Sequence, residues 1–388
     1  MQVELIIKNL KVYNSYFKKF IKGDVLINKG KFLHIGKGYE DRLWSENVID
    51  GEGKYIIPGL IDIHMHIESS MTIPREFSKA AIKHGVTTVV ADPHEIANVF
   101  GIRGIEEFIK FKGKLDIFYG IPSSVPSTSS SLETTGEQIT YNEVKRLLEY
   151  DNIICLGEVM NFKDLIEDDD SNINKIINIS KEKNIPLEGH CPKIQGVDLS
   201  LYIYRGVNGD HTQQSVGSLQ EKIQNGMFIE MQHKSMTLEN IKFLIENNLY
   251  EHFALVTDDV MADKLVKGHL NEILKEAVKL GMSIENAIYV ATYTPARRMN
   301  LLDRGTIAPG KLADFILLDS IEDFNIYEVY KNGEMVFNRD KGLKEEFFED
   351  KSKLDYRFYN SIELNNITKE SLEVKVPNKY KNLSLIHI

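Results

Sequence analysis

Histidines and carboxylates stand where apolar runs of the sequence end, and their side chains are of the kinds that bind divalent cations. The residues concerned are His64, His66, Glu158, His190, His211 and Asp258. Side chains two residues apart on a strand point to the same face, so His64 and His66 enter one space together. Carboxylates are almost never fully buried without a partner, and a cation is the simplest partner for this set. Nitrogen and oxygen donors without thiolate favour Zn2+, Mn2+ or Fe2+.

Four imidazoles and two carboxylates supply enough ligands for two ions, and Glu158 stands centrally enough to bridge them. A divalent ion lowers the pKa of a bound water to roughly 7, which provides hydroxide at neutral pH. Asp258 would take the proton of that water and pass it to the leaving group, as a general base and then a general acid. The six residues therefore predict metal-assisted hydrolysis.

Each of these residues also has an ordinary structural interpretation. An isolated His-x-His pair is a weak signal, Glu158 or Asp258 could cap a helix, and His190 could pair with Cys191 in the core. Cys191 itself is interpreted as a small buried hydrophobe. The joint occurrence at several strand ends favours the metal hypothesis. His233 stays open between lining the pocket and standing apart from it, and four other histidines are expected to be ordinary residues of helices or loops: His34, His84, His252 and His269.

The elements that must position these residues are apolar runs that alternate with amphipathic stretches. The runs are IIPGLIDIH, VTTVVAD, LDIFYGI, NIICLGE, IPLEGH, GVNGDH, MFIEMQ and FALVTDD. Continuously apolar strands between helices indicate a parallel sheet buried on both faces. Eight of them predict an α/β fold, a (β/α)8 TIM barrel, whose chemistry lies at the C-terminal ends of the strands. A doubly wound open sheet is the alternative, but no glycine-rich phosphate fingerprint follows the first strand.

Both ends of the chain have a different pattern, in which apolar and polar residues alternate as in half-buried antiparallel strands. We expect breaks at Gly23, Lys29-Gly30 and Gly36, and a hairpin turn at Asn332-Gly333. The predicted domains are a small β-sandwich from residues 1–57 plus 306–345, and the barrel from residues 58–305. Residues 346–382 would form a linker or the start of a further C-terminal domain.

The composition restricts the class of protein. The chain has 388 residues, a net charge of −10, 42% hydrophobic residues and two cysteines. The acidic balance argues against nucleic-acid and anionic-membrane partners, and no apolar run reaches membrane-spanning length. Two cysteines cannot build a disulfide framework, which favours the cytoplasm. We therefore expect a soluble cytoplasmic enzyme.

Several longer motifs resemble one family. The stretches PGLIDIHMH and GTIAPGKLADFILLD are similar to the metal-dependent amidohydrolase superfamily, and six others resemble its adenine deaminase family: HIESSM, ADPHEIANV, PSSVPSTSSSLETTG, LGEVMNF, GHCP and TDDVMADKLVKGHL. The resemblance implies a purine-salvage hydrolase that converts adenine to hypoxanthine and ammonia. It also implies two divalent ions, Mn2+ or Fe2+ with Zn2+ as a further candidate, and a homo-oligomer.

The resemblance assigns the same six residues as metal ligands, with Glu158 as the bridge and Asp258 as the proton shuttle. It places further residues in the family's most recognisable motifs: Glu68, Ser69, Asp92, His94 and Glu95. They would hold the purine, support the ligands or form an extra metal site. Asp258 and His233 are the candidates for protonating the ring. Thr212 follows His211 where many family members carry Glu, which puts a role for that carboxylate in doubt.

The competing functions are an amidohydrolase that acts on a cyclic amide or another amino-heterocycle, and a catalytically incomplete fragment. The fragment hypothesis comes from the C-terminal residues 383–388, LSLIHI, which match the translation of a widely used transposase adapter. We interpret them as a sequencing artefact that follows a cut near Asn382. Family members continue into a further domain that this sequence lacks.

Overall fold

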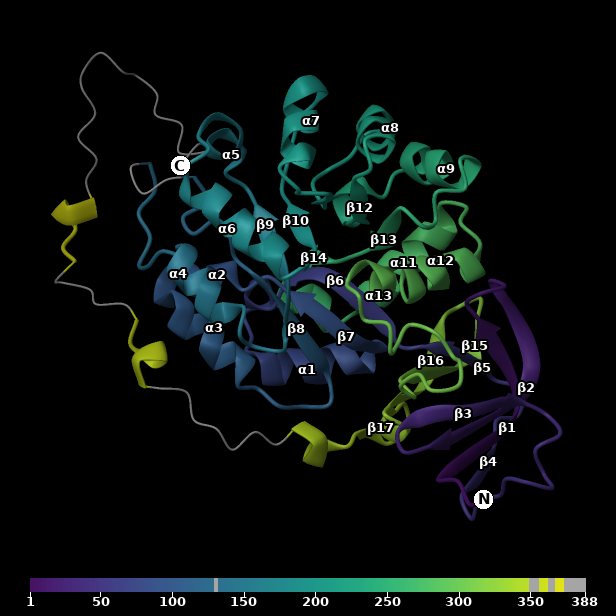
Figure 1. The fold of residues 1–388 in the computed structure, drawn as a ribbon. Coiled ribbons are helices and arrows are strands. Elements are labelled where there is room, and N and C mark those ends of the chain that lie inside the picture. Colours follow the sequence, from purple (N-terminus) through teal and green to yellow (C-terminus); the bar gives the residue numbers. More distant parts are fainter. Residues whose placement is uncertain (129–131, 349–355, 362–366, 373–388) are drawn as a thin grey trace. The chain divides into compact units, whose positions relative to one another are not determined.

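The structure is a computed structural model that describes residues 1–128, 132–348, 356–361 and 367–372 (Figure 1). Residues 1–350 form one compact unit, and residues 351–388 form a second one. The described parts of the second unit include two short 3-10 helices, η4 (Tyr356–Tyr359) and η5 (Glu370–Leu372). Much of the predicted linker at 346–382, and the whole of 383–388, lies outside the described residues.

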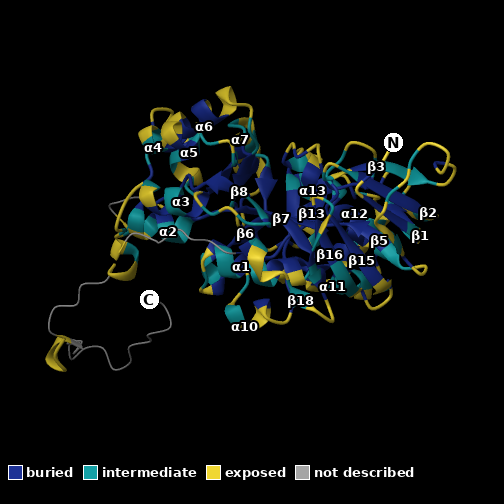
Figure 2. Ribbon diagram, turned by 90° about the horizontal axis from the view of Figure 1, so that it is seen from below, coloured by how far each residue is buried: buried dark blue, intermediate teal, exposed yellow. Residues whose placement is uncertain are grey.

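Parallel strands occupy the middle of the first unit, and each predicted apolar run contains at least one of them. They are β6 (Leu60–His66), β7 (Val86–Ala91), β8 (Asp116–Ile121), β9 (Ile153–Val159), β10 (Leu187–Gly189), β11 (Gly209–Asp210), β12 (Phe228–Met231), β13 (Phe253–Leu255) and β14 (Asp258–Asp259). β6 and β7 are buried along their whole length, as expected for strands covered on both faces. Figure 2 shows this buried interior with exposed residues on the surrounding helices and loops.

The strand order follows the chain and nearly closes on itself. One sheet has the order β10-β9-β8-β7-β6-β14 and another the order β11-β12-β13. The Asn208 amide donates to the Leu187 carbonyl at 3.2 Å, which connects the two sheets at β10 and β11. On the other side, β13 continues after two residues into β14, which pairs with β6. The fold is therefore TIM-barrel-like α/β, and the sequential order does not match a doubly wound sheet.

Helices alternate with these strands, as the amphipathic stretches between the apolar runs predict, for example at REFSKAAIKHG on α1 and NEILKEAVKLG on α11 (Figure 1). Side chains close several N-termini: Thr140 and Glu143 form a capping box on α4, and Ser171 caps α6. The helices are α1 (Pro74–Lys83), α2 (His94–Phe100), α3 (Ile102–Ile109), α4 (Tyr141–Leu147), α5 (Phe162–Glu167), α6 (Asn172–Glu182), α7 (Gly196–Tyr204), α8 (Val216–Gln224), α9 (Leu238–Glu246), α10 (Ala262–Leu265), α11 (Leu270–Lys279), α12 (Ile284–Val290) and α13 (Tyr293–Arg298), with 3-10 helices η1 (Glu68–Ser70), η2 (His233–Ser235) and η3 (Glu345–Phe348).

Strands from both chain ends form one further sheet, in the order β18-β17-β16-β15-β5-β1-β2-β3 with β4 beside β1. Its strands are β1 (Leu5–Asn14), β2 (Lys19–Asn28), β3 (Lys31–Gly36), β4 (Val48–Asp50), β5 (Tyr55–Pro58), β15 (Phe315–Ser320), β16 (Asn325–Lys331), β17 (Glu334–Asn338) and β18 (Gly342–Leu343). β5 joins the halves, because it pairs with both β1 and β15. The two-layered sandwich and the domain limits stay predictions.

The turns at Lys29-Gly30 and Asn332-Gly333 are confirmed, since all four residues have positive φ between 49° and 76°. The expected break at Gly23 is wrong. β2 runs through Gly23, which lies opposite a register shift of β1 between Ile7 and Leu10. A side chain there would meet Gly36 at 3.3 Å, so close strand approach explains this glycine. Among the described residues, no helix combines the length and apolar character that crossing a membrane requires.

Candidate metal centre

The C-terminal strand ends bring the six predicted ligands into one buried cluster. His64 and His66 lie at the end of β6, Glu158 near the end of β9, His190 just after β10, His211 just after β11, and Asp258 on β14. Five of these side chains are at most 8% exposed, whereas His190 is 35% exposed. The interpretation of His190 as a satisfied core residue is therefore wrong.

The Glu158 carboxylate lies among the four imidazoles. Its Oε1 is 3.0 Å from His66 Nε2, 3.3 Å from His64 Nε2 and 3.6 Å from His211 Nε2, and its Oε2 is 3.1 Å from His190 Nδ1. Burial alone would raise the pKa of Glu158, but the surrounding imidazoles hold it well below its ordinary value. A carboxylate whose two oxygens both face ligand histidines is suited to bridging two cations.

Asp258 completes the group beside β6. Its Oδ1 is 3.4 Å from His66 Nε2 and 3.8 Å from His64 Nε2, and its Oδ2 accepts a hydrogen bond from Gln232 Nε2 at 2.5 Å. The backbone of Asp258 has φ of 59°, a left-handed conformation that costs of order 1–3 kcal/mol at a residue other than glycine. Such strain persists where its surroundings fix a side chain for a task, which agrees with a working carboxylate.

The imidazoles approach one another closely enough to require a cation or protons between them. The rings of His64 and His211 stack at 3.7 Å between centroids, and His190 Nδ1 lies 3.1 Å from His211 Nε2. Burial and the neighbouring His64 lower the pKa of His211 to about 4, so it does not take up a proton at neutral pH. His64 Nε2 and His211 Nδ1 are buried without a hydrogen-bond partner. These unpaired donor atoms fit a site for divalent cations.

Backbone groups orient the ligands. His66 Nδ1 lies 2.9 Å from the Asp92 carbonyl, which can only accept, so Nδ1 carries the proton and Nε2 is free to face Glu158 and Asp258. The Asp92 carboxylate accepts from the Glu158 amide at 2.8 Å, and Ser123 Oγ donates to the Glu158 carbonyl at 2.9 Å. Asp92 therefore supports the Glu158 backbone.

The other motif residues lie together beside His66, on η1 and at the start of α2. Glu68 Oε1 accepts from the Ile96 amide at 3.1 Å, and Ser69 Oγ donates to Asp259 Oδ1 at 2.5 Å. The His94 ring lies between two carboxylates: its Nδ1 is 3.7 Å from Asp92 Oδ1, and its Nε2 is 3.5 Å from Glu95 Oε1. Burial and the charge of Glu95 raise the pKa of Glu68 to about 7. The side-chain atoms Glu68 Oε2, His94 Nδ1 and Glu95 Oε2 are buried without a hydrogen-bond partner.

A cavity of about 360 Å³ opens beside Asp258. Its lining includes His233 from η2, Lys234, Val260 and Lys267. His233 therefore lies at the cavity, although the structure assigns it no chemical role. Lys234 Nζ is 3.8 Å from Asp258 Oδ2, so a cation faces the carboxylate from the cavity side.

Sequence reasoning missed several polar residues around the centre. His269, expected to be ordinary, is buried at the N-terminus of α11, and its Nδ1 lies 3.7 Å from Asp62 Oδ2. Thr257 Oγ1 donates to the same Asp62 at 2.6 Å, which fixes the residue before Asp258. Glu230, on β12, lies beneath His64. The one available signal was a polar residue inside an apolar run. His34 lies in strand β3, not in a helix or loop as expected.

Comparisons with known proteins agree with this geometry. The amidohydrolase family profile matches residues 55–336. An adenine deaminase of Clostridium perfringens is 98% identical over 382 residues, which cover 98% of this chain and 67% of that protein. This chain thus spans about two thirds of the length of that curated relative. Among solved structures, enamidase has a TM-score of 0.67 at 17% identity, covering 87% of this chain and 96% of that chain.

A second solved structure is the beta-aspartyl dipeptidase of Fervidobacterium islandicum AW-1, with a TM-score of 0.65 at 21% identity. It covers 88% of this chain and 97% of that chain. At such identities the two structures support the fold alone, whereas the profile covers most of the chain, including all six predicted ligands. The chain therefore belongs to the amidohydrolase family.

Proposed function

We propose that the chain is an adenine deaminase, which hydrolyses the exocyclic C–N bond of adenine to give hypoxanthine and ammonia. Two observations support the proposal: the cluster around Glu158 offers unpaired ligand atoms to divalent cations, and the C. perfringens relative of that name is 98% identical. The proposed ligands are the six clustered residues. Mn2+ or Fe2+ is the preferred occupant, with Zn2+ as a further candidate.

When bound, the ions would supply an activated water for attack on the amidine carbon of the ring. Asp258 is proposed to accept the water proton and to deliver it to the departing nitrogen, because its carboxylate faces both the ligand histidines and the cavity. Gln232 and Lys234 would hold that carboxylate from the cavity side. His233 is the second candidate for protonating the ring, since it lines the same cavity.

Glu68, Ser69, Asp92, His94 and Glu95 are proposed to bound the purine site on the side of His66. The Ser69 to Asp259 hydrogen bond links their loop to the loop that follows Asp258, so both loops can border one ligand. The unpaired oxygens of Glu68 and Glu95 suit the ring N–H and amino groups of a purine.

Ammonia release tests the proposal. Metal-free protein is reconstituted with Mn2+, Fe2+ or Zn2+ and mixed with adenine, guanine, cytosine or a hydantoin. We expect release from adenine and none from the others. No release from adenine with any of the metals would refute the proposal, and turnover of a hydantoin instead would identify a different amidohydrolase. The Asp258→Asn variant is the matched control, since it keeps the size of the side chain and removes the proton acceptor.

A further inference from the structure

Glu230 is a fully buried carboxylate beneath the candidate metal centre, and nothing above gives it a role. It lies on β12 with 0% exposure, and its Oε2 is 3.6 Å from His64 Nδ1. We propose that Glu230 is a positioning residue that holds His64 in the ring orientation and protonation pattern a metal ligand needs. The inference rests on the proposed metal centre.

The two nitrogens of His64 face different partners. Nε2 points to Glu158 Oε1 and Asp258 Oδ1, at 3.3 Å and 3.8 Å. An imidazole that offers one nitrogen to a cation keeps its proton on the other, so Nδ1 must donate. Glu230 Oε2 is the carboxylate oxygen in front of Nδ1, at 3.6 Å, and neither Glu230 oxygen has a hydrogen-bond partner among the described residues, so a small approach of the two side chains would satisfy both.

The neighbouring ligand His66 obeys the same rule with a different acceptor. Its Nδ1 meets the Asp92 backbone carbonyl at 2.9 Å. A charged acceptor makes a stronger hydrogen bond than a carbonyl and raises the basicity of the ring it holds. His64 should therefore depend more on its partner than His66 does.

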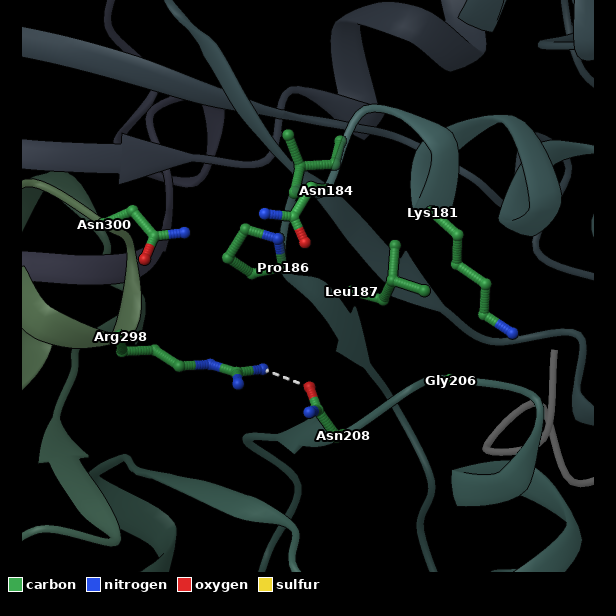
Figure 3. Close-up of a pocket in the computed structure, with 9 residues that line it drawn as sticks. Lys181, Asn184, Pro186, Leu187, Gly206, Asn208, Arg298 and Asn300 are labelled. Carbon is green, nitrogen blue, oxygen red and sulfur yellow. Dashed lines mark hydrogen bonds between the residues drawn. The ribbon is translucent and has the colours of Figure 1, made fainter.

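Other charged groups accompany Glu230 inside the barrel. Arg298 donates from Nε to Glu188 Oε1 at 2.9 Å. Its terminal nitrogen donates to Asn208 Oδ1 at 2.8 Å (Figure 3). Burial and the charge of Glu188 raise the pKa of Glu230 well above its ordinary value, and His64 and Arg298 oppose that rise. Arg298 lines a pocket of about 370 Å³. Figure 3 shows it there with Pro186 and Leu187, which lie at the start of β10 and thus at the opposite end of the barrel from the metal centre. Arg298 and His64 are therefore the groups that favour the ionised form of Glu230 in this buried site.

The test is a Mn2+ titration of the metal-free chain, followed by competition with a chelating indicator and not by activity. We expect Glu230→Leu to bind one of two ions about 10- to 100-fold more weakly than the wild type. Glu230→Gln keeps an acceptor oxygen without the charge, so a smaller loss of about threefold to tenfold is expected.

Asp314→Asn is the matched control. Asp314 is also a buried carboxylate, with its Oδ2 2.5 Å from Lys331 Nζ, but it directly precedes β15 in the sheet that both chain ends form, away from the metal centre. It should lower the melting temperature and leave Mn2+ affinity unchanged, which separates positioning from general destabilisation.

Wild-type affinity for both ions in Glu230→Leu would overturn the inference. If that variant does not fold, wild-type affinity in Glu230→Gln would overturn it instead. A wild-type chain that binds Mn2+ but releases no ammonia from adenine would contradict the proposed activity while the comparison between variants still decides the role of Glu230. A wild-type chain that binds no Mn2+ would overturn both.

Discussion

Replacing Lys222 by methionine should strongly destabilise the barrel, because it leaves the Asp210 carboxylate buried without its cation. The side chains are 2% and 0% exposed, and Lys222 Nζ lies 2.7 Å from Asp210 Oδ2. At an effective dielectric constant of about 20, the attraction at that distance is of order 6 kcal/mol. Part of it is offset in the variant, which no longer desolvates an ammonium group.

Three neighbours retain hydrogen bonds to the uncompensated Asp210 in the variant: the Cys191 amide, Thr212 Oγ1 and Gln214 Nε2. We therefore expect a loss of about 3–5 kcal/mol, as in other broken buried pairs. The double variant Lys222→Met, Asp210→Asn removes both charges and should lose less than Lys222→Met alone. Because Asp210 precedes His211 and holds the amide that follows His190, the single variant should also bind metal more weakly.

Urea unfolding followed by circular dichroism measures these free energies, with calorimetry to compare the variants. The metal-free form is used for all variants, so that differences in metal binding do not enter the unfolding free energy. A loss below about 1 kcal/mol for Lys222→Met, or a double variant less stable than the single one, would refute the reasoning.

Three further predictions concern the centre and its support. Asp258→Asn should lower kcat at least about 100-fold even at metal concentrations that restore the wild-type metal content, and full activity would exclude the proton-shuttle role. In Gly157→Ala the new Cβ would lie 2.2 Å from Asp92 Oδ2, so the support of Glu158 should fail and metal content should fall, which elemental analysis measures. Asp210 has its pKa lowered to about 2, mainly because its lysine partner outweighs burial. The ionised Asp210 should contribute roughly 2 kcal/mol to the free energy of unfolding at any pH above its ordinary pKa of 3.8, and this contribution should be lost as the pH falls through 2. If the unfolding free energy of the wild type does not fall over this pH range, the prediction is wrong.

The strand ends were predictable because two simple signals coincide there. An apolar run fixes where a parallel strand lies, and a His or Asp directly after the run must then stand at the C-terminal face. The alternation of side chains along a strand was enough to predict that His64 and His66 share a face. The dipeptide Asn332-Gly333 was enough to predict a hairpin turn. The pairing of β14 with β6 could not be predicted from local sequence patterns, because it joins segments far apart in the chain that meet only when the strands form a ring.

The groups beneath the centre were not predictable from the same signals. Glu230 sits in the run MFIEMQ, where a single polar residue looks like one that faces solvent at a strand edge. Inside a closed barrel the inward face is also buried, so the residue must instead find a partner such as His64. His269 follows a loop, and its burial depends on Asp62 on β6 and on Thr257 in the link between β13 and β14.

The metal content of the wild type beside Glu158→Gln tests the central claim most directly. Two divalent ions are expected per reconstituted wild-type chain, because both oxygens of Glu158 face ligand histidines, Oε1 at His66 and Oε2 at His190. The variant should lose one or both ions while remaining folded. Two ions per chain in Glu158→Gln, bound as tightly as in the wild type, would contradict the bridging role.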